Sequence, residues 1–178
     1  MRRSGLPLSI PDLEWRIAAS EETFVRAERR QAGGRPAYRE EIVMGRFADK
    51  RILIVDDDPD IVTAIKAALE DEDFEAKIEN VGDGNSAVEM ISDNAPDLLI
   101  LDQMLPGRSG FLVMEKIRPL RKDTGKPCVI MITANPGARH KVYAQTLGVD
   151  AYLNKPFRME RLIRAAEELL ETGKIEKK

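Results

Sequence analysis

Five side chains able to take part in metal or phosphoryl chemistry stand at the ends of short apolar runs. Asp56 and Asp57 follow "RILIV", and Asp102 follows "DLLIL". Thr133 ends "PCVIMIT", and Lys155 follows "AYLN". Grouped carboxylates raise one another's pKa, and a hard divalent cation such as Mg²⁺ relieves that repulsion. A lysine and a hydroxyl beside them would complete a site for a transferring phosphoryl group, with one carboxylate as the nucleophile.

These groups can meet only if the apolar runs are neighbouring strands. The expected strands are 51–55, 75–80, 97–101, 127–133 and 151–154, and amphipathic helical stripes cover 59–70, 109–120 and 157–170. The stripe of the first helix consists of Ile61, Ile65, Ala68 and Leu69. Strands that are apolar throughout are typical of sheets covered on both faces. The pattern predicts a doubly wound parallel α/β sheet, in which ligands bind at the carboxyl ends of the strands.

The bulk composition favours a packed soluble domain. The 178 residues are 43% hydrophobic and 33% charged, and the net charge of −3 disfavours nucleic-acid binding through bulk electrostatics. No apolar run reaches membrane-spanning length, and no signal-peptide core precedes Pro11. The single cysteine, Cys128, excludes an internal disulfide. We therefore expect a cytoplasmic protein that does not bind membranes.

The composition changes near Met44. Residues 1–43 contain eight arginines and no lysine, and we interpret them as an N-terminal extension. The extension could be a partner-docking helix, a loosely ordered segment or an over-extended reading frame, with the natural start at Met44. Beyond it we expect a linker at 44–50, the α/β domain at 51–172 and a C-terminal tail at 173–178.

Four pieces of the sequence resemble the receiver domain of two-component response regulators. They are "ILIVDDDPD", "PDLLILDQMLPGRSG", "VIMITA" and "DAYLNKPF", in the order and spacing of that family. Each piece is weak by itself, and the specificity lies in their combination. The resemblance implies a flavodoxin-like (βα)5 fold with strand order 2-1-3-4-5.

The resemblance also implies a role for each residue of the expected site. Asp102 resembles the phosphoacceptor and a metal ligand, Asp57 the direct Mg²⁺ ligand, and Asp56 a ligand that acts through water. Met104 would add its backbone carbonyl to the metal. The residues implied in phosphoryl binding and switching are Thr133, Lys155 and Tyr152, with Ala134 and Pro156 in supporting places. For Tyr152, a half-buried strand tyrosine without a switching role is the competing interpretation.

The implied function is that of a signalling phosphoacceptor rather than an enzyme with a separate substrate. The phosphoryl donor would be a histidine kinase or a histidine phosphotransfer protein. Only "TGKIEKK" follows the last expected helix, so we expect a stand-alone receiver that signals through a partner protein or a phosphorylation-dependent homodimer.

Three alternatives stand beside this interpretation. The first is a pseudo-receiver that is never phosphorylated and binds partners constitutively, which the full set of acids, threonine and lysine disfavours. The second is a phosphatase of the haloacid-dehalogenase type, but Met104 stands where that family has a second aspartate. The third is a DNA-binding regulator, which the short C-terminal segment and the acidic charge disfavour.

Overall fold

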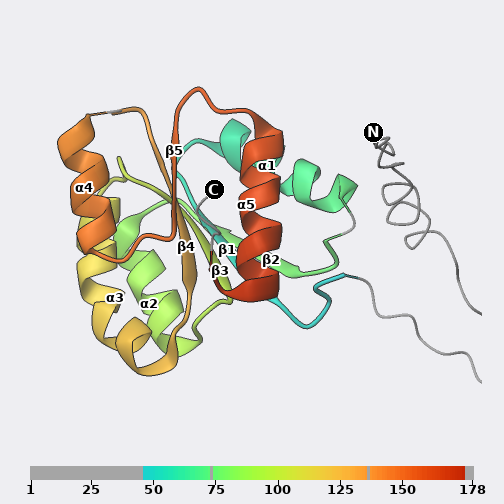
Figure 1. The fold of residues 1–178 in the computed structure, drawn as a ribbon, viewed down its shortest axis with the longest axis horizontal. Coiled ribbons are helices and arrows are strands. Elements are labelled where there is room, and N and C mark those ends of the chain that lie inside the picture. The colour runs from blue at the N-terminus through green and yellow to red at the C-terminus, as the bar shows by residue number, and fades with distance from the viewer. Residues whose placement is uncertain (1–45, 73, 136, 175–178) are drawn as a thin grey trace, which may run out of the picture. The chain divides into compact units, whose positions relative to one another are not determined.

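The computed structural model describes residues 46–72, 74–135 and 137–174, which form a parallel sheet flanked by helices (Figure 1). The strands are β1 (Arg51–Val55), β2 (Lys77–Val81), β3 (Leu98–Asp102), β4 (Cys128–Thr133) and β5 (Ala151–Asn154). The helices are α1 (Pro59–Asp71), α2 (Gly84–Asp93), α3 (Gly110–Thr124), α4 (Ala138–Thr146) and α5 (Met159–Thr172). The strand order is β2-β1-β3-β4-β5 with every pairing parallel, so the predicted fold class is confirmed.

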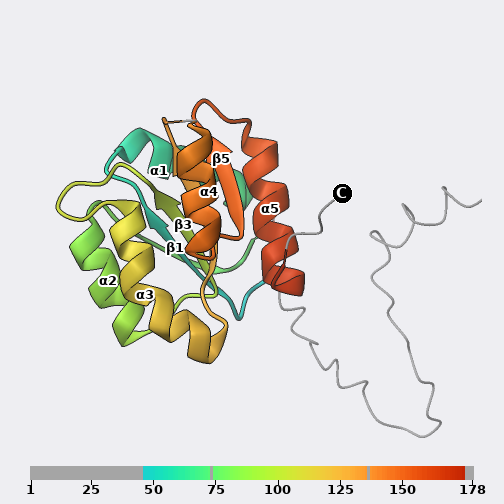
Figure 2. The same cartoon turned by 60° about the vertical axis from the view of Figure 1, so that its left-hand side comes forward.

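The helices cover both faces of the sheet. Helices α1 and α5 pack on one face, and α2, α3 and α4 pack on the other (Figures 1 and 2). Because successive strand side chains point to opposite faces, each central strand contributes to two cores. Ile100 of β3, for example, belongs to the α1/α5 core, whereas its neighbours Leu99 and Leu101 belong to the other.

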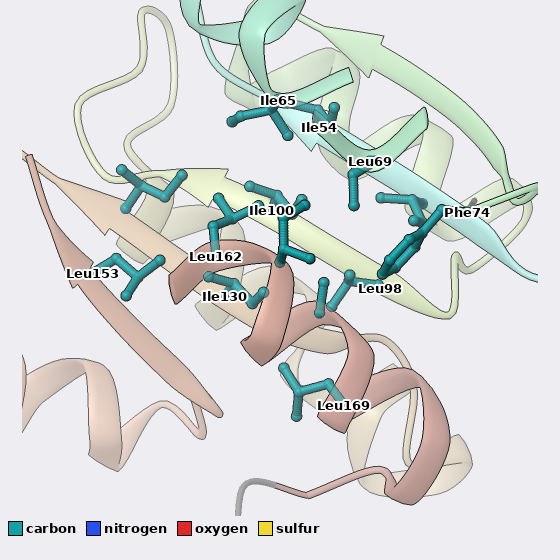
Figure 3. Packing of buried hydrophobic residues seen from close by; sticks show 14 of the residues in the cluster. Ile54, Ile65, Leu69, Phe74, Leu98, Ile100, Ile130, Leu153, Leu162 and Leu169 are labelled. Atoms are coloured by element: carbon teal, nitrogen blue, oxygen red, sulfur yellow. The ribbon is translucent and has the colours of Figure 1, made fainter. Parts of the chain in front are cut away.

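The core under α1 and α5 is built largely from buried aliphatic side chains. Figure 3 shows Ile54, Ile100 and Ile130 of three adjacent strands meeting Ile65 of α1 and Leu162 of α5. Burying one such side chain contributes about 1.5–3 kcal/mol. This packing fixes the positions of the central strands, whose carboxyl ends carry the predicted site residues.

Several bounds differ from the sequence-based expectation: β2 is Lys77–Val81 rather than 75–80, α3 ends at Thr124 rather than at 120, and α5 is Met159–Thr172 rather than 157–170. Two further differences concern β3 and α1. Strand β3 ends at Asp102 rather than before it, because Asp102 is still paired with Ile132 of β4. In α1 the buried side chains are Val62, Ile65 and Leu69, while the predicted Ile61 and Ala68 are only partly buried. The buried stripe is therefore rotated slightly from the predicted one.

The start of α1 explains one of the acids that follow β1. Asp58 is the N-cap, and its Oδ1 accepts a hydrogen bond of 2.9 Å from the Asp60 amide. Such a cap satisfies backbone donors that the first helical turn leaves open. With Pro59 as the first helical residue, Asp58 has a structural role, and Asp56 and Asp57 remain for the site.

Residues 46–50, predicted as part of a linker, lie against the domain. The Arg46 guanidinium contacts the carboxylates of Glu167 and Glu171 on α5, at 2.6 Å in each case. The ring centroid of Phe47 lies 4.8 Å from that of Phe74. The predicted extension at 1–43 and the possible start at Met44 lie outside the described residues. Within the described part of the chain, no helix is long and apolar enough to cross a membrane.

Candidate functional site

Three carboxylates meet at the carboxyl edge of the sheet. Asp56 follows β1 directly, and Asp102 ends β3, the strand beside it. With Asp57 they form a group in which one carboxylate oxygen of each residue lies within 4.8 Å of the others. Asp56 and Asp102 are buried, whereas Asp57 is exposed. The arrangement offers oxygen ligands of the kind that Mg²⁺ prefers, on a site that is open at one side.

Lys155 places a cation between two of these acids. Its Nζ lies 2.9 Å from Oδ2 of Asp56 and 3.1 Å from Oδ1 of Asp102. The backbone holds the lysine there, because the Lys155 amide donates a hydrogen bond of 2.7 Å to the Thr133 carbonyl. The bond between Lys155 and Pro156 is cis. The lysine predicted from the sequence is thus brought to the predicted acids.

The electrostatics of this pair follow from burial and from the short contacts. Burial raises the pKa of the Asp102 carboxyl, the hydrogen bond and charge of Lys155 lower it in part, and the Asp56 charge adds to the rise. For Lys155, burial alone would lower the pKa. Its hydrogen bonds to Asp56 and Asp102 outweigh that effect, so the net pKa is raised and the lysine stays protonated at neutral pH.

The turn after Asp102 packs closely under the acid. The Met104 amide donates a hydrogen bond of 2.9 Å to Oδ2 of Asp102. The Gly110 amide donates one of 3.0 Å to the Gln103 carbonyl, and a Cβ at Gly110 would lie 2.3 Å from the Asp102 carbonyl oxygen. The Met104 side chain is exposed. The two oxygens of Asp102 are therefore oriented separately, one by Lys155 and the other by the Met104 amide.

Thr133 lies at the end of β4 in a chain of hydrogen bonds. Its fully buried hydroxyl donates to the Oε1 atom of Gln103 and accepts a hydrogen bond of 2.9 Å from the Asn135 amide. The Tyr152 hydroxyl in turn donates to the Asn135 carbonyl over 3.4 Å. Thr133 and Tyr152, both predicted as switch residues, are thus connected through Asn135. Ala134, predicted in a supporting place, is exposed between Thr133 and Asn135.

Gln103 was not singled out from the sequence. The residue is only 5% exposed, and its Oε1 atom accepts the hydrogen bond from the Thr133 hydroxyl. A signal was available: counting by twos from Leu99 and Leu101 puts position 103 on an inward-facing register, where a carboxamide needs a partner. The sequence alone does not identify Thr133 as that partner, because the contact depends on the pairing of β3 with β4.

Comparison with protein-family models and curated proteins matches the domain that carries this site. A model described as the response regulator receiver domain matches residues 52–167. The DNA-binding response regulator MtrA of Mycolicibacterium smegmatis is 38% identical over 114 residues, which are 64% of this chain and 47% of that protein. The chain therefore spans about half the length of the curated relatives it matches.

Solved structures agree with the fold. The receiver domain of a Francisella response regulator is 29% identical, with a TM-score of 0.61 over 70% of this chain and 99% of that one. A CheY-like receiver domain protein of Methanospirillum hungatei is 30% identical, with a TM-score of 0.60 over 68% of this chain and 94% of that one.

Proposed function

The chain belongs to the response regulator receiver domain family of two-component signalling, and on this basis we propose that its Asp102 is the phosphoacceptor. The donor would be a histidine kinase or a histidine phosphotransfer protein. The observation that carries the proposal is the contact of Lys155 with both Asp56 and Asp102 beside the exposed Asp57. A nucleophile, a cation and metal-ligating oxygens then stand within one small volume.

The proposed transfer uses a carboxylate oxygen of Asp102 as nucleophile. It attacks the phosphorus of the donor's phosphohistidine, a phosphorus–oxygen bond forms, and the phosphorus–nitrogen bond breaks. The imidazole of the donor leaves with the electron pair of that bond and takes up a proton. The product is an aspartyl phosphate, a mixed anhydride that water hydrolyses back to Asp102 and inorganic phosphate.

Mg²⁺ is the proposed cofactor, and the donor set fits it. Asp56, Asp57 and Asp102 would hold the ion, with the backbone carbonyl of Met104 as a further oxygen. When bound, the ion would neutralise charge on the acids and on the phosphoryl oxygens. This proposal gives a role to the three acids that remain once Asp58 is assigned to the cap of α1.

Lys155 and Thr133 are the proposed partners of the phosphoryl oxygens. Lys155 is already a protonated donor beside Asp102, so it can pair with an oxygen of the incoming group without a large movement. Thr133 would turn its hydroxyl toward the group, and Tyr152 would move with it through Asn135. Ala134 and Pro156 are proposed to support these residues through the adjoining backbone.

We propose that phosphorylation is read by protein contact. A partner protein or a phosphorylation-dependent homodimer would recognise the face that includes Tyr152. The curated relatives are named as DNA-binding response regulators, and this chain matches about half their length. Absence of nucleic-acid binding, like a cytoplasmic location, stays a prediction. We do not propose an enzymatic activity beyond the protein's own phosphorylation and dephosphorylation.

Intact mass spectrometry after incubation with acetyl phosphate and Mg²⁺ tests the proposal. The native chain should gain one phosphoryl group, Asp102→Asn should gain none, and chelation of Mg²⁺ should suppress the gain. A folded native chain without added mass, from acetyl phosphate and from a panel of purified histidine kinases alike, would contradict phosphoacceptor function. The pseudo-receiver alternative would then account for the intact fold.

A further inference from the structure

The Thr133 hydroxyl is already engaged before any phosphoryl group arrives. A hydroxyl has one proton, and two acceptors lie within its reach: Oε1 of Gln103 and, farther away at 3.5 Å, the Asn135 carbonyl. The much shorter contact assigns the proton to Gln103. Both residues are buried: Thr133 has no exposed surface, and Gln103 is 5% exposed. Water therefore cannot readily replace either partner, and a buried polar group that loses its partner costs free energy.

The backbone fixes Gln103 in this position. Its amide donates a hydrogen bond of 2.8 Å to the Ile132 carbonyl of β4, and its carbonyl accepts one of 3.0 Å from the Gly110 amide. Asp102 pairs with Ile132 in the sheet, so Gln103 and Thr133 are the next cross-strand neighbours on the opposite face. The carboxamide is thus held against the hydroxyl by the register of β3 and β4.

From these contacts we propose that Gln103 is a positioning residue that holds Thr133 in the resting arrangement. The Thr133 proton can point to Gln103 or to a phosphoryl oxygen on Asp102, but not to both. The hydrogen bond from Thr133 to Gln103 therefore competes with the activated arrangement and sets the resting equilibrium of the switch. This inference rests on the proposed function of Asp102 and Thr133.

The hydrogen bonds beyond Thr133 extend the effect to β5. Asn135 donates to the Thr133 hydroxyl through its amide and accepts from Tyr152 through its carbonyl. Release of Thr133 from Gln103 would change the hydroxyl that orients Asn135. Because the Tyr152 hydroxyl donates to the Asn135 carbonyl, an acceptor that directly follows β3 would influence an aromatic side chain on β5.

The test compares Gln103→Met with the native chain. Methionine keeps the unbranched shape and has no strong acceptor, so it should remove the competition without a cavity. The probe is beryllofluoride with Mg²⁺, a stable mimic of the aspartyl phosphate, titrated by calorimetry. We expect Gln103→Met to bind the probe about fivefold more tightly, the ratio that one ordinary buried hydrogen bond supports.

A double-mutant cycle with Thr133→Val separates the proposed role from general packing. In the valine background, Gln103→Met should leave the affinity unchanged, because the hydroxyl proton for which the two sites compete is gone. Equal affinities of the native chain and Gln103→Met, or the same gain in both backgrounds, would overturn the inference. Gln103→Leu serves as a second variant if thermal unfolding shows that Gln103→Met does not fold.

Phosphorylation of the native chain by acetyl phosphate is measured in parallel by intact mass. If the native chain accepts the phosphoryl group and Gln103→Met binds the probe no more tightly, only the positioning role of Gln103 fails. If no phosphorylation and no probe binding occur in the folded native chain, the proposed function fails, and the inference fails with it. The two failures are therefore distinguishable.

Discussion

The Nζ atom of Lys155 lies 3.1 Å from Oδ1 of Asp102, and the same ammonium lies 2.9 Å from Oδ2 of Asp56. One cation thus serves two buried carboxylates that arrive from different strands. Without it, two buried acids and the nearby Asp57 would face one another uncompensated. This shared contact links the stability of the domain to its chemistry.

Removing the lysine should damage both stability and phosphoryl uptake. Lys155→Met leaves buried carboxylates without their partner, and we expect a loss of about 3 kcal/mol in the free energy of unfolding without divalent cations. Urea unfolding measures this loss. Phosphorylation by acetyl phosphate should slow by at least about tenfold, because a positive partner of the phosphoryl oxygens is lost. Lys141→Met, on the exposed side of α4, is the matched control and should change neither quantity.

Neutralising the acid should act in the opposite direction on stability. Burial raises the pKa of Asp102, which means that the folded state disfavours its negative charge relative to the unfolded state. Asp102→Asn should therefore increase the free energy of unfolding in the absence of divalent cations. Urea unfolding at pH 7 in the presence of a chelator provides the measurement. A clear loss of stability would contradict the interpretation that burial of the Asp102 carboxylate costs the folded state more than its contact with Lys155 returns.

Mg²⁺ should stabilise the native chain through the three acids. A ligand that binds only the folded state raises stability with its concentration, by about 2.7 kcal/mol at a hundred times its dissociation constant. The midpoint of thermal unfolding should rise with added Mg²⁺ in the native chain and stay nearly constant in Asp57→Asn. Asp57 is exposed, so this change leaves the core intact. Asp71→Asn at the end of α1 is the control and should keep the full Mg²⁺ response.

Asp97 directly precedes β3, at the opposite end of the strand from Asp102. It should make the free energy of unfolding depend on pH. Burial alone would raise its pKa, but hydrogen bonds from Lys126 and from the Arg51 amide bring it below its ordinary value of 3.8. A lowered carboxyl pKa contributes stability above the unfolded value, and this contribution disappears as pH falls through the folded one. We expect Asp97→Asn to cost about 1–2 kcal/mol at pH 7.

Urea unfolding across a pH series checks this prediction for Asp97. The difference from the native chain should be constant between about pH 7 and pH 5 and should shrink below about pH 4, where the carboxyl of the unfolded chain protonates. Asp93→Asn, at the exposed end of α2, is the control and should stay within about 0.5 kcal/mol of the native chain. A difference for Asp97→Asn that persists unchanged into acid would argue against the ion pair with Lys126.

Gly110 should tolerate no side chain. A Cβ there would lie 2.3 Å from the Asp102 carbonyl oxygen and 3.0 Å from the Gln103 Cα, both of them backbone atoms. Gly110→Ala must therefore displace the turn that follows the proposed phosphoacceptor, and we expect a loss of about 1–3 kcal/mol. Gly82→Ala is the matched control, because its nearest atoms are 3.8 Å away. Circular dichroism melts of both variants give the comparison.

Much of the fold could be predicted because strand and helix patterns are local. Apolar runs such as 51–55 and 128–133 need only their own composition to be identified as buried strands. The acids were assigned to one edge by a general property of parallel sheets, in which carboxyl ends share an edge. The predicted stripe of α1 did not include Val62, which is buried. Its burial depends on side chains that come from elements far away in the sequence.

Local sequence patterns do not predict the contacts between residues at the ends of different strands. The chain alone places an acid after β1, an acid at the end of β3 and a lysine after β5. Only the packed sheet puts Lys155 between Asp56 and Asp102 and sets Gln103 against Thr133. Residue type and periodicity determine what each strand carries to the edge. Which atoms meet there depends on strand order and register, and these come from interactions between segments far apart in the chain.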